Sequence, residues 1–309
     1  MVDNIAIGND IIIIKTQINS IFLTYYLNYI YKNIAKLSQG VTVYHLKIND
    51  LKNLSIKIPS KESQDNISDF LLLFEKRINL LKRKKEAYEN IKEYLLKHLF
   101  PLNDNDNPSL NFGNSSWKYV KLSDYGIAHN GLMGKSKKDF GEGKAYLEYK
   151  SILNGEYADL SRISYVKIDD NEKQYILKKN DVIFSISSEI PQEVALASLV
   201  PSCTKELYLN SFCYAYTIND KTKLDPLFLV YYFRSPNMRH KITSLSQGST
   251  RYNLSKSAVL NMNIPITSLE NQKKIVNILK NIDKKLTTTQ LEIDIITKYK
   301  RRIISLIFY

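Results

Sequence analysis

The sequence predicts an α+β protein, in which a domain built on a twisted sheet or partial barrel is joined to two long helices that pair as an antiparallel coiled coil. Three observations predict this class: a repeat within the chain, two long stretches with heptad spacing, and a series of short strand signals between them. The chain has 309 residues, of which 44% are apolar, so it is long enough for two modest domains with hydrophobic cores.

One segment of the chain occurs twice, and Leu37 returns at Leu245, a shift of 208 positions. Both copies begin with Leu-Ser-Gln-Gly, and the shift then stays constant from residue 37 to residue 100. The further identities are Thr42 with Thr250, Tyr44 with Tyr252, Leu46 with Leu254, Asn53 with Asn261, Ile56 with Ile264, Glu62 with Glu270, Gln64 with Gln272, and Phe100 with Phe308. A single repeat at this distance predicts a duplicated module, not a solenoid.

Residues 1–60 are predicted to be the C-terminal part of the first copy of this module. We expect a buried strand at residues 10–15 and a helix at residues 18–35. Only residues 1–36 precede the first Leu-Ser-Gln-Gly, whereas residues 117–244 precede the second. Most of the first module is therefore expected to be absent from the chain.

Residues 61–100 and 269–309 are predicted to be long helices that pair with each other. The apolar positions in both alternate steps of four and three residues, which is the spacing of a heptad seam. The seam positions are Ile67, Leu71, Phe74, Ile78, Leu81, Lys85, Tyr88, Lys92, Leu95 and Leu99 in the first helix, and Ile275, Leu279, Ile282, Leu286, Thr289, Ile293, Ile296, Lys300, Ile303 and Ile307 in the second. Neither helix is apolar all round, so each needs a partner for its stripe. The alternative is a helical hairpin that only dimerises the chain.

Residues 101–116 are predicted to be a linker, because Pro101 ends a helix and the Asn- and Asp-rich run after it favours turns. Such a linker lets the two long helices lie antiparallel with a globular module between them. Residues 117–268 are predicted to form that module, an α+β domain of short strands separated by Gly, Asn and Asp turns. The strand signals lie at residues 118–122, 146–150, 163–168, 181–186, 193–199 and 211–218, and a helix signal lies at 225–243.

The formal charge of the chain is +13, and its pI is near 9.3. This charge suits a polyanionic partner, and nucleic acid better than a membrane because no short basic amphipathic anchor is present. The alternative is a lysine-rich solvated surface. The sequence has no transmembrane run and no signal-peptide pattern at Met1, so we expect a cytoplasmic protein without a membrane partner. Cys203 and Cys213 lack zinc-ligand spacing and are expected to be buried thiols, although their separation permits a disulfide as the alternative.

No sequence motif for catalysis, metal binding or cofactor binding is found. Gly141-Glu142-Gly143-Lys144 lacks the spacing of a phosphate-binding loop and is expected to be a plain turn. Glu189 and Glu193 are close enough in sequence to face each other, but no basic or metal-binding group organises them. The tetrapeptide Asn/Asp-Pro-Pro-aromatic, with which amino-methyltransferases hold a flipped base, is also missing. The chain is therefore predicted to bind a ligand and not to be an enzyme.

The loop at residues 247–253 combines the residue types that contact nucleic acid. Ser249 and Thr250 supply hydroxyls for phosphate, Arg251 can fork onto guanine or phosphate, and Tyr252 adds an aromatic ring. The alternative is an ordinary turn before a strand, with Tyr252 packed in the core.

A second loop, at residues 134–138, offers Lys135, Lys137 and Lys138 for contact with phosphate, and its alternative is a solvated run of charges. Further candidate DNA contacts follow the strand signal at residues 181–186 or stand elsewhere in the module. These candidates are Ser185, Ser187, Ser188, Gln192, Lys150, Arg162 and Arg239.

The chain contains five motifs in the same order as in a known family. They are Trp117-x-x-Val120-x-Leu122, Lys179-Asn180-Asp181-Val182-Ile183, Gly248-Ser249-Thr250-Arg251-Tyr252-Asn253-Leu254, Ile264-Pro265, and Glu270-Asn271-Gln272-x-x-Ile275. With the internal duplication, they make the chain resemble the specificity subunit of type I restriction-modification systems over essentially its full length. The resemblance implies two target-recognition domains held apart by an antiparallel pair of conserved helices.

The resemblance further implies that each recognition domain reads one half of a split double-stranded DNA site. It implies that the helices dock two methyltransferase subunits, and that a restriction subunit adds DNA cleavage. S-adenosylmethionine and ATP would then be bound by the partner subunits, and the specificity subunit itself would carry no cofactor.

The chain departs from this family in its first recognition domain, of which residues 1–60 are the expected remnant. Three alternatives follow: an allele that reads one half-site, two copies that associate to read a symmetric site, or a missing part supplied by a separate chain. A rival function is a scaffold or decoy that recruits methyltransferase subunits, or regulates their assembly, without reading DNA.

Overall fold

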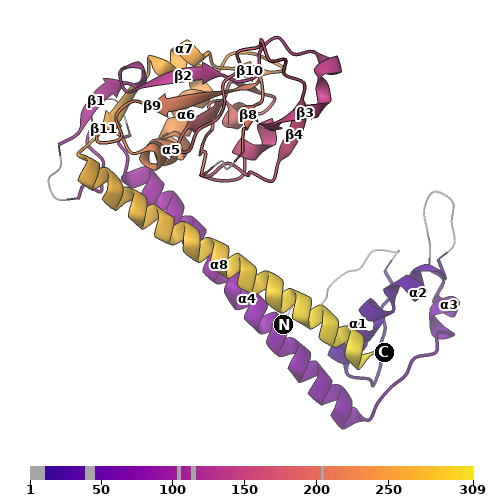
Figure 1. Cartoon of the computed structure of the whole chain (residues 1–309). Helices are drawn as coiled ribbons and strands as arrows, with labels where there is room; N and C mark the ends of the chain where they lie inside the picture. The colour runs from indigo at the N-terminus through magenta and orange to yellow at the C-terminus, as the bar shows by residue number, and fades with distance from the viewer. Residues whose placement is uncertain (1–10, 39–45, 103–105, 113–115, 203–204) are drawn as a thin grey trace. The chain divides into compact units, whose positions relative to one another are not determined.

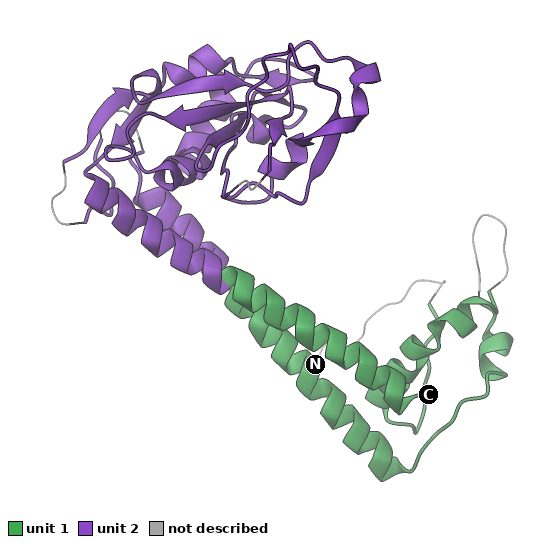
Figure 2. Ribbon diagram, in the orientation of Figure 1, with its two compact units in different colours: residues 1–87, 286–309 green, residues 88–285 purple. Residues whose placement is uncertain are grey.

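The computed structural model describes residues 11–38, 46–102, 106–112, 116–202 and 205–309. These residues form two compact units, one of residues 1–87 and 286–309 and the other of residues 88–285 (Figure 2). The two long helices are α4 (Lys61–His98) and α8 (Leu269–Ile307) (Figure 1), and each contributes a segment to both units (Figure 2). The predicted α+β class with two long helices is confirmed.

The main sheet of the second unit has four antiparallel strands in the order β2–β9–β5–β7. They are β2 (Gly126–Asn130), β9 (Cys213–Ile218), β5 (Val182–Ser185) and β7 (Ala197–Leu199). Helix α5 (Pro226–Arg234) packs on this sheet, and its seven consecutive residues from Leu227 to Phe233 are all buried. The sheet is therefore covered by a helix that is apolar on nearly every side.

A second sheet in this unit has three strands in the order β4–β3–β8. Strands β3 (Phe140–Leu147) and β4 (Ile163–Val166) are antiparallel, and β8 (Tyr208–Leu209) runs parallel to β3. Two further pairs are β1 (Lys118–Lys121) with β11 (Asn263–Ile266), and β6 (Ser187–Ser188) with β10 (Tyr252–Asn253). None of these four sheets closes into a barrel among the described residues.

The remaining helical segments are short. They are α1 (Ser20–Tyr29), α2 (Tyr31–Ala35), α3 (Ile48–Lys52), η1 (Leu122–Asp124), η2 (Lys137–Asp139), η3 (Tyr149–Ile152), η4 (Pro191–Glu193), α6 (Pro236–Leu245) and α7 (Lys256–Leu260).

Several strand and helix bounds differ from the prediction for local reasons. The strand expected at residues 146–150 begins earlier, because Gly141 and Gly143 lie inside β3 and not in a plain turn. Both glycines have positive φ, 121° and 105°, next to the register shift between Phe140 and Lys144, as in a β-bulge. The predicted helix at residues 225–243 is interrupted at Ser235, because Pro236 has no N–H to continue the hydrogen-bond ladder of α5.

The predicted strand at residues 10–15 is wrong for its described part, residues 11–15. Ile11 and Ile13 are 58% and 60% exposed and pair with no strand among the described residues. The matching segment of the second unit, β9, lies between two neighbouring strands, and the described residues of the first unit supply no such neighbour. The predicted helix at residues 18–35 forms as α1 and α2 with a break at Ile30. The first copy of the Gln-Gly loop lies largely outside the described residues.

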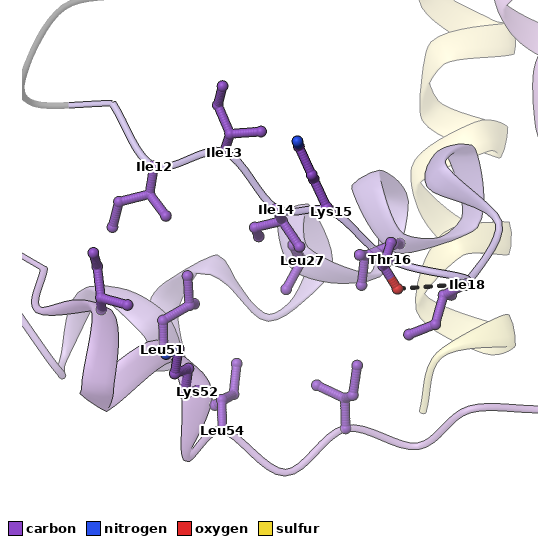
Figure 3. Close-up of a pocket in the computed structure, with 13 residues that line it drawn as sticks. Ile12, Ile13, Ile14, Lys15, Thr16, Ile18, Leu27, Leu51, Lys52 and Leu54 are labelled. Carbon is purple, nitrogen blue, oxygen red and sulfur yellow. Dashed lines mark hydrogen bonds between the residues drawn. The ribbon is translucent and has the colours of Figure 1, made fainter.

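An apolar pocket of about 340 Å³ lies in the first unit (Figure 3). Its walls include Ile12 and Ile14 on the extended segment, Leu27 on α1, and Leu51 and Leu54 on and after α3. In the second unit, the positions that the repeat makes equivalent to Leu27, Leu51 and Leu54 are Phe233, Val259 and Met262, which are buried in the main core. The pocket therefore lies where the second unit has its sheet.

The two long helices pair along their heptad seams within each unit. In the first unit Ile78 and Leu81 of α4 form a buried cluster with Ile293 of α8. In the second unit Lys92 Nζ lies 2.6 Å from a carboxylate oxygen of Asp283. Because Lys92 is a seam position, its charge is matched across the seam and not left unpaired.

The repeat is visible as one set of contacts made twice. Near the start of α4, Gln64 Oε1 accepts from the backbone N–H of Asn19 at 2.9 Å, and Asn19 caps α1. Near the start of α8, Gln272 Oε1 accepts from the backbone N–H of Asp225 at 2.8 Å, and Asp225 caps α5. The repeated glutamine thus holds the start of the preceding short helix in both units, which explains its place in the Glu-x-Gln motif.

A second repeated set joins a tyrosine, a carboxylate and a lysine. Tyr25 donates to Glu75 at 3.2 Å, and Lys300 forms an ion pair with Glu75. The equivalent set in the second unit is Tyr231, whose hydroxyl donates to Asp283 at 2.5 Å, and Lys92. The hydrogen bond from Lys300 is the main reason that the pKa of Glu75 lies below its usual value.

Candidate nucleic-acid interface

The predicted loop at residues 247–253 is a closed hairpin in the second unit. Gln247 and Asn253 exchange two backbone hydrogen bonds, of 3.0 Å and 2.8 Å. Gly248 has a φ of 128°, and a Cβ at this position would lie 2.0 Å from the carbonyl oxygen of Arg251. Only glycine fits there, so the glycine of the repeated motif closes the loop. Ser249, Thr250 and Arg251 remain exposed at its tip.

Strand pairing brings this loop beside the predicted segment at residues 185–188. Tyr252 pairs with Ser188 and Asn253 with Ser187 in the short antiparallel sheet of β10 and β6. Tyr252 is half-buried and packs against the main core, so it anchors the loop to the rest of the second unit. Two regions that lie far apart in the sequence therefore form one surface.

The serines of this surface are largely engaged within the protein. Ser185 is 1% exposed and donates to the carbonyl of Glu193 at 2.5 Å. Ser188 is 7% exposed and donates to the Glu193 carboxylate at 2.6 Å, and Ser187 is 8% exposed. These side chains shape the surface, whereas their exposed neighbours are the groups that a ligand would meet.

An open pocket of about 620 Å³ lies beside the paired strands. It gathers two of the predicted cations, Lys150 and Arg251, with both β6 serines. Its lining residues are Tyr146, Glu148, Tyr149, Lys150, Leu153, Ser187, Ser188, Glu189, Ile190, Glu193, Asn210, Phe212 and Arg251. Cations, carboxylates and aromatic rings thus share one concave site, which suits a polar ligand with flat faces and hydrogen-bonding edges.

Arg251 is held by two neighbours that the sequence did not single out as DNA contacts. One guanidinium nitrogen lies 3.6 Å from a carboxylate oxygen of Glu189, and its central carbon lies 5.2 Å from the ring centre of Phe212. The Arg251 side chain is nevertheless 50% exposed, and that of Glu189 is 78% exposed. The expectation that no basic group organises Glu189 is therefore wrong, because strand pairing places Arg251 beside it.

Glu193 organises the opposite side of the pocket. It accepts hydrogen bonds from Ser188 at 2.6 Å and from the Tyr149 hydroxyl at 3.2 Å. Burial, together with the negative charge of Glu193, raises the pKa of Tyr149 to about 12, against the opposing hydrogen bond with Ser188. Tyr149 therefore stays a neutral hydrogen-bonding group at physiological pH.

The predicted basic loop is only partly available for a ligand. The Lys135 side chain is 5% exposed and forms an ion pair with Glu172 at 2.5 Å. Lys137 and Lys138 are exposed on η2, which Ser136 and Asp139 stabilise with reciprocal hydrogen bonds. Neither lysine lines the pocket.

Three other candidates lie outside the pocket lining. Arg239 has a structural role, because its guanidinium donates to the carbonyls of Val194 at 2.5 Å and of Gln192 at 2.9 Å. Burial lowers the pKa of Arg239 to about 10. Arg162 forms an ion pair with Asp159 at 3.2 Å. The Gln192 side chain is exposed, although its carbonyl accepts from Arg239.

Glu189 and Phe212, the two partners of Arg251, line the pocket but were not predicted from the sequence as DNA contacts. Glu189 directly follows the predicted Ser187-Ser188 pair, which is a usable signal, whereas Phe212 reaches the site only through the fold. Within the described residues, no group of three His, Cys, Asp or Glu residues could hold a metal ion. No described helix is long and apolar enough to cross a membrane.

Comparison with known families decides the class of this protein. The model of the type I restriction modification DNA specificity domain matches residues 4–90 and again residues 114–297. The chain belongs to this family. Its predicted family resemblance is confirmed, and each of the two matched ranges covers most of one copy of the internal repeat.

Individual members of the family cover nearly the whole chain. The type I restriction enzyme MjaVIII specificity subunit of Methanocaldococcus jannaschii is 21% identical over 306 residues, which is 94% of this chain and 69% of the relative. The structure of the HsdS subunit from Thermoanaerobacter tengcongensis has a TM-score of 0.54 at 18% identity. The match covers 93% of this chain and 69% of the HsdS chain. The type I S subunit from M. genitalium has a TM-score of 0.58 at 19% identity, with 94% and 72% covered. At these identities the solved structures show a shared fold.

Membership of the specificity family gives the chain a role in DNA sequence specificity. The pocket beside β6 and β10 brings together four of the predicted DNA contacts, Lys150, Ser187, Ser188 and Arg251.

Proposed function

We propose that residues 117–268 read one half of a split DNA target, and that α4 and α8 dock the methyltransferase subunits of a type I restriction-modification complex. The observation that carries the reading role is the convergence of the hairpin at residues 247–253, the segment at residues 185–189 and Lys150 on one open pocket. Exposed Lys137 and Lys138 would add phosphate contacts that do not depend on sequence.

The docking role rests on apolar side chains that the helices leave exposed. Leu73 and Leu80 of α4 are 63% and 50% exposed, and Leu291 and Ile295 of α8 are 56% and 53% exposed. Ile91 and Tyr299 are equivalent positions of the repeat, and they are 44% and 59% exposed. Exposed apolar residues in such number on two helices favour a protein partner.

The chain would act without a catalytic group of its own. In this proposal the methyltransferase subunits bind S-adenosylmethionine and the restriction subunit uses ATP, while this chain selects the DNA site. A second half-site would need a second recognition domain, supplied by another copy of the chain or by another polypeptide.

The test combines assembly with target mapping. The chain would be co-expressed with its neighbouring methyltransferase, the mass of the complex measured by light scattering, and methylated adenines mapped in genomic DNA by long-read sequencing. A split motif supports the proposal, and two symmetric halves with two copies in the complex identify self-association. A stable complex that methylates no motif would contradict the reading role and favour the scaffold or decoy.

The hairpin provides the matched variants. Arg251→Ala and Thr250→Ala are expected to lower the DNA affinity of the assembled complex. Lys221→Gln removes an exposed charge outside the pocket and should change the affinity little. Unchanged DNA binding in both hairpin variants would remove the central residues of the proposal.

A further inference from the structure

The side chains of Arg251 and Glu189 form a cross-strand pair, which places a hydrogen-bond donor beside an acceptor. Tyr252 lies opposite Ser188 in the antiparallel register, so the next residues outward, Arg251 and Glu189, lie opposite each other. Their side chains meet at 3.6 Å. The backbone therefore holds a donor group and an acceptor group side by side at the rim of the pocket.

Phe212 restricts the position of the guanidinium. Its ring lies 5.2 Å from the central carbon of Arg251, within the range of a cation–π contact. Phe212 is 46% exposed, and the Asn210 side chain holds its backbone by accepting from the Phe212 N–H at 2.9 Å. Arg251 is thus partly ordered before a ligand arrives, while its outer edge remains open.

The neighbouring carboxylate makes a phosphate an unsuitable ligand for this arginine. A phosphate that approached Arg251 would also approach the negative charge of Glu189, and such like charges repel. The other carboxylates of the pocket, Glu148 and Glu193, add to this repulsion. A neutral base edge meets no such penalty.

The order of donors and acceptors selects among base pairs. In the major groove a G·C pair presents two adjacent acceptors, N7 and O6 of guanine, followed by the N4 amino donor of cytosine. An arginine fork beside a carboxylate complements that order, because the fork spans adjacent acceptors and the carboxylate accepts from the amino group. In an A·T pair the N6 amino donor separates the two acceptors, so the fork cannot span them.

We propose that Arg251 and Glu189 together read one G·C pair of the target in the major groove, with Phe212 as a positioning residue. This assignment rests on the proposed function, since it requires that the second unit read DNA. It names a specificity-determining pair and the base pair that the pair selects.

The experiment uses the assembled complex and duplexes that contain the motif mapped from genomic methylation. Each guanine of the motif is replaced in turn by 7-deazaguanine, which lacks the N7 acceptor, and each G·C pair in turn by A·T. For the wild-type chain we expect one pair at which both replacements weaken binding about tenfold, the loss of one good side-chain-to-base contact. Arg251→Ala and Glu189→Gln should each lose most of the preference at that pair and keep it at the others.

Control variants separate this pair from general effects. Lys221→Gln removes an exposed charge outside the pocket and should keep every base preference. Phe212→Leu should weaken the preference at the same pair without moving it to another position. Thermal unfolding of each complex shows whether a variant remains folded.

Two outcomes would overturn the assignment in different ways. A defined motif whose preferences are all unchanged in folded Arg251→Ala and Glu189→Gln complexes would overturn the G·C assignment and leave the proposed function standing. A wild-type complex without any motif would overturn the proposed function, and the assignment with it.

Discussion

Two arginines of the second unit, Arg239 and Arg251, show how one residue type serves two purposes. Arg239 donates to backbone carbonyls of the segment at residues 192–195 and is largely buried, whereas Arg251 lies half-exposed at the pocket rim. Removal of the first leaves buried carbonyls without donors, and removal of the second leaves no buried group unpaired.

Stability measurements should therefore separate these two arginines. Arg239→Met is expected to lower the free energy of unfolding by about 2–4 kcal/mol, and Arg251→Ala by less than about 0.5 kcal/mol. Urea unfolding followed by circular dichroism measures both. Equal destabilisation by the two substitutions would contradict the different roles.

The buried ion pairs of Lys92 give a pH dependence with a definite sign. Lys92 Nζ lies 2.5 Å from Glu156 and 2.6 Å from Asp283. Burial opposes ionisation of Glu156, but the charge and hydrogen bond of Lys92 outweigh it and hold the pKa of Glu156 below its usual 4.5. A carboxylate with a lowered folded pKa stabilises the fold above its ordinary pKa, and this contribution is lost as pH falls through the folded value.

The substitution Lys92→Met should expose that dependence. At pH 7 it leaves Glu156 buried without its main cation, and we expect a loss of about 3 kcal/mol. As pH falls below 4.5 and through the lowered pKa of Glu156, the wild type loses the contribution of the pair, so the difference in stability between the two proteins should narrow. Urea midpoints between pH 3 and pH 7 measure the difference, and a constant difference over that range would count against the ion pair as its cause.

At the scale of elements, the ends of the long helices are fixed by equivalent phenylalanines. Phe100, just after α4, packs on Phe228 and Tyr232, with ring centres 5.3 Å and 5.6 Å away. Phe308, just after α8, packs on Phe22 and Tyr26, each at 5.4 Å. The aromatic partners come from α5 in the second unit and from α1 in the first.

Removal of each phenylalanine should loosen only the short helix that it contacts. Phe100→Ala is expected to lower the free energy of unfolding by about 3–5 kcal/mol, because Phe100 is fully buried. Phe308→Ala should lower it by less, because Phe308 is half-buried. Hydrogen exchange should accelerate in α5 for Phe100→Ala and in α1 for Phe308→Ala. Acceleration in both helices for either variant would show that the two packing sites are not independent.

The exposed faces of α4 and α8 permit a direct test of docking. Ile91→Lys and Tyr299→Lys alter equivalent positions, and each places a charge where an apolar partner surface is proposed. Each should lower the number of methyltransferase subunits per complex, measured by light scattering. Each should change the free energy of unfolding of the free chain by less than about 0.5 kcal/mol, measured by thermal unfolding. Lys298→Glu, a change at an exposed polar position of α8, serves as a control. Full methyltransferase occupancy in both lysine variants would place docking elsewhere.

Elements that depend on local spacing or on the repeat could be predicted well. The heptad seams of α4 and α8 follow from apolar spacing, and the role of Gln64 and Gln272 is signalled by their recurrence at a constant shift. The break before Pro236 was missed, although proline is a local signal.

Elements that depend on distant partners could not be predicted. Strands β6 and β10 have two residues each, which is too short for an alternating pattern to reveal them or their pairing. Arg239 donates to backbone carbonyls. Every residue has such a carbonyl, so the sequence does not reveal which of them will need a side-chain donor. Ile11 to Ile14 have the composition of a buried strand, but the described part of the first unit offers them no neighbouring strand.

For the whole molecule, the net charge of +13 predicts DNA binding that weakens with salt. Lys137 and Lys138 are exposed, so each is available to neutralise one phosphate. Lys137→Gln and Lys138→Gln should each reduce the slope of log affinity against log salt by about 0.9 and leave base preferences unchanged. Lys221→Gln, which removes an exposed charge outside both loops, should keep the wild-type slope. Fluorescence anisotropy with a labelled duplex at several salt concentrations measures the slopes, and unchanged slopes in both loop variants would exclude these phosphate contacts.

The repeated ion pairs of the long helices also affect how two molecules can meet. Glu75 and Lys92 of α4 are equivalent to Asp283 and Lys300 of α8, so each helix carries both a carboxylate and a lysine of the paired sets. Two copies of α4 from different molecules, aligned antiparallel, can therefore make the same pairs with each other as α4 makes with α8, and so can two copies of α8. We therefore expect association of like helices from two chains to compete with the pairing of α4 and α8 within one chain when refolding chains are concentrated.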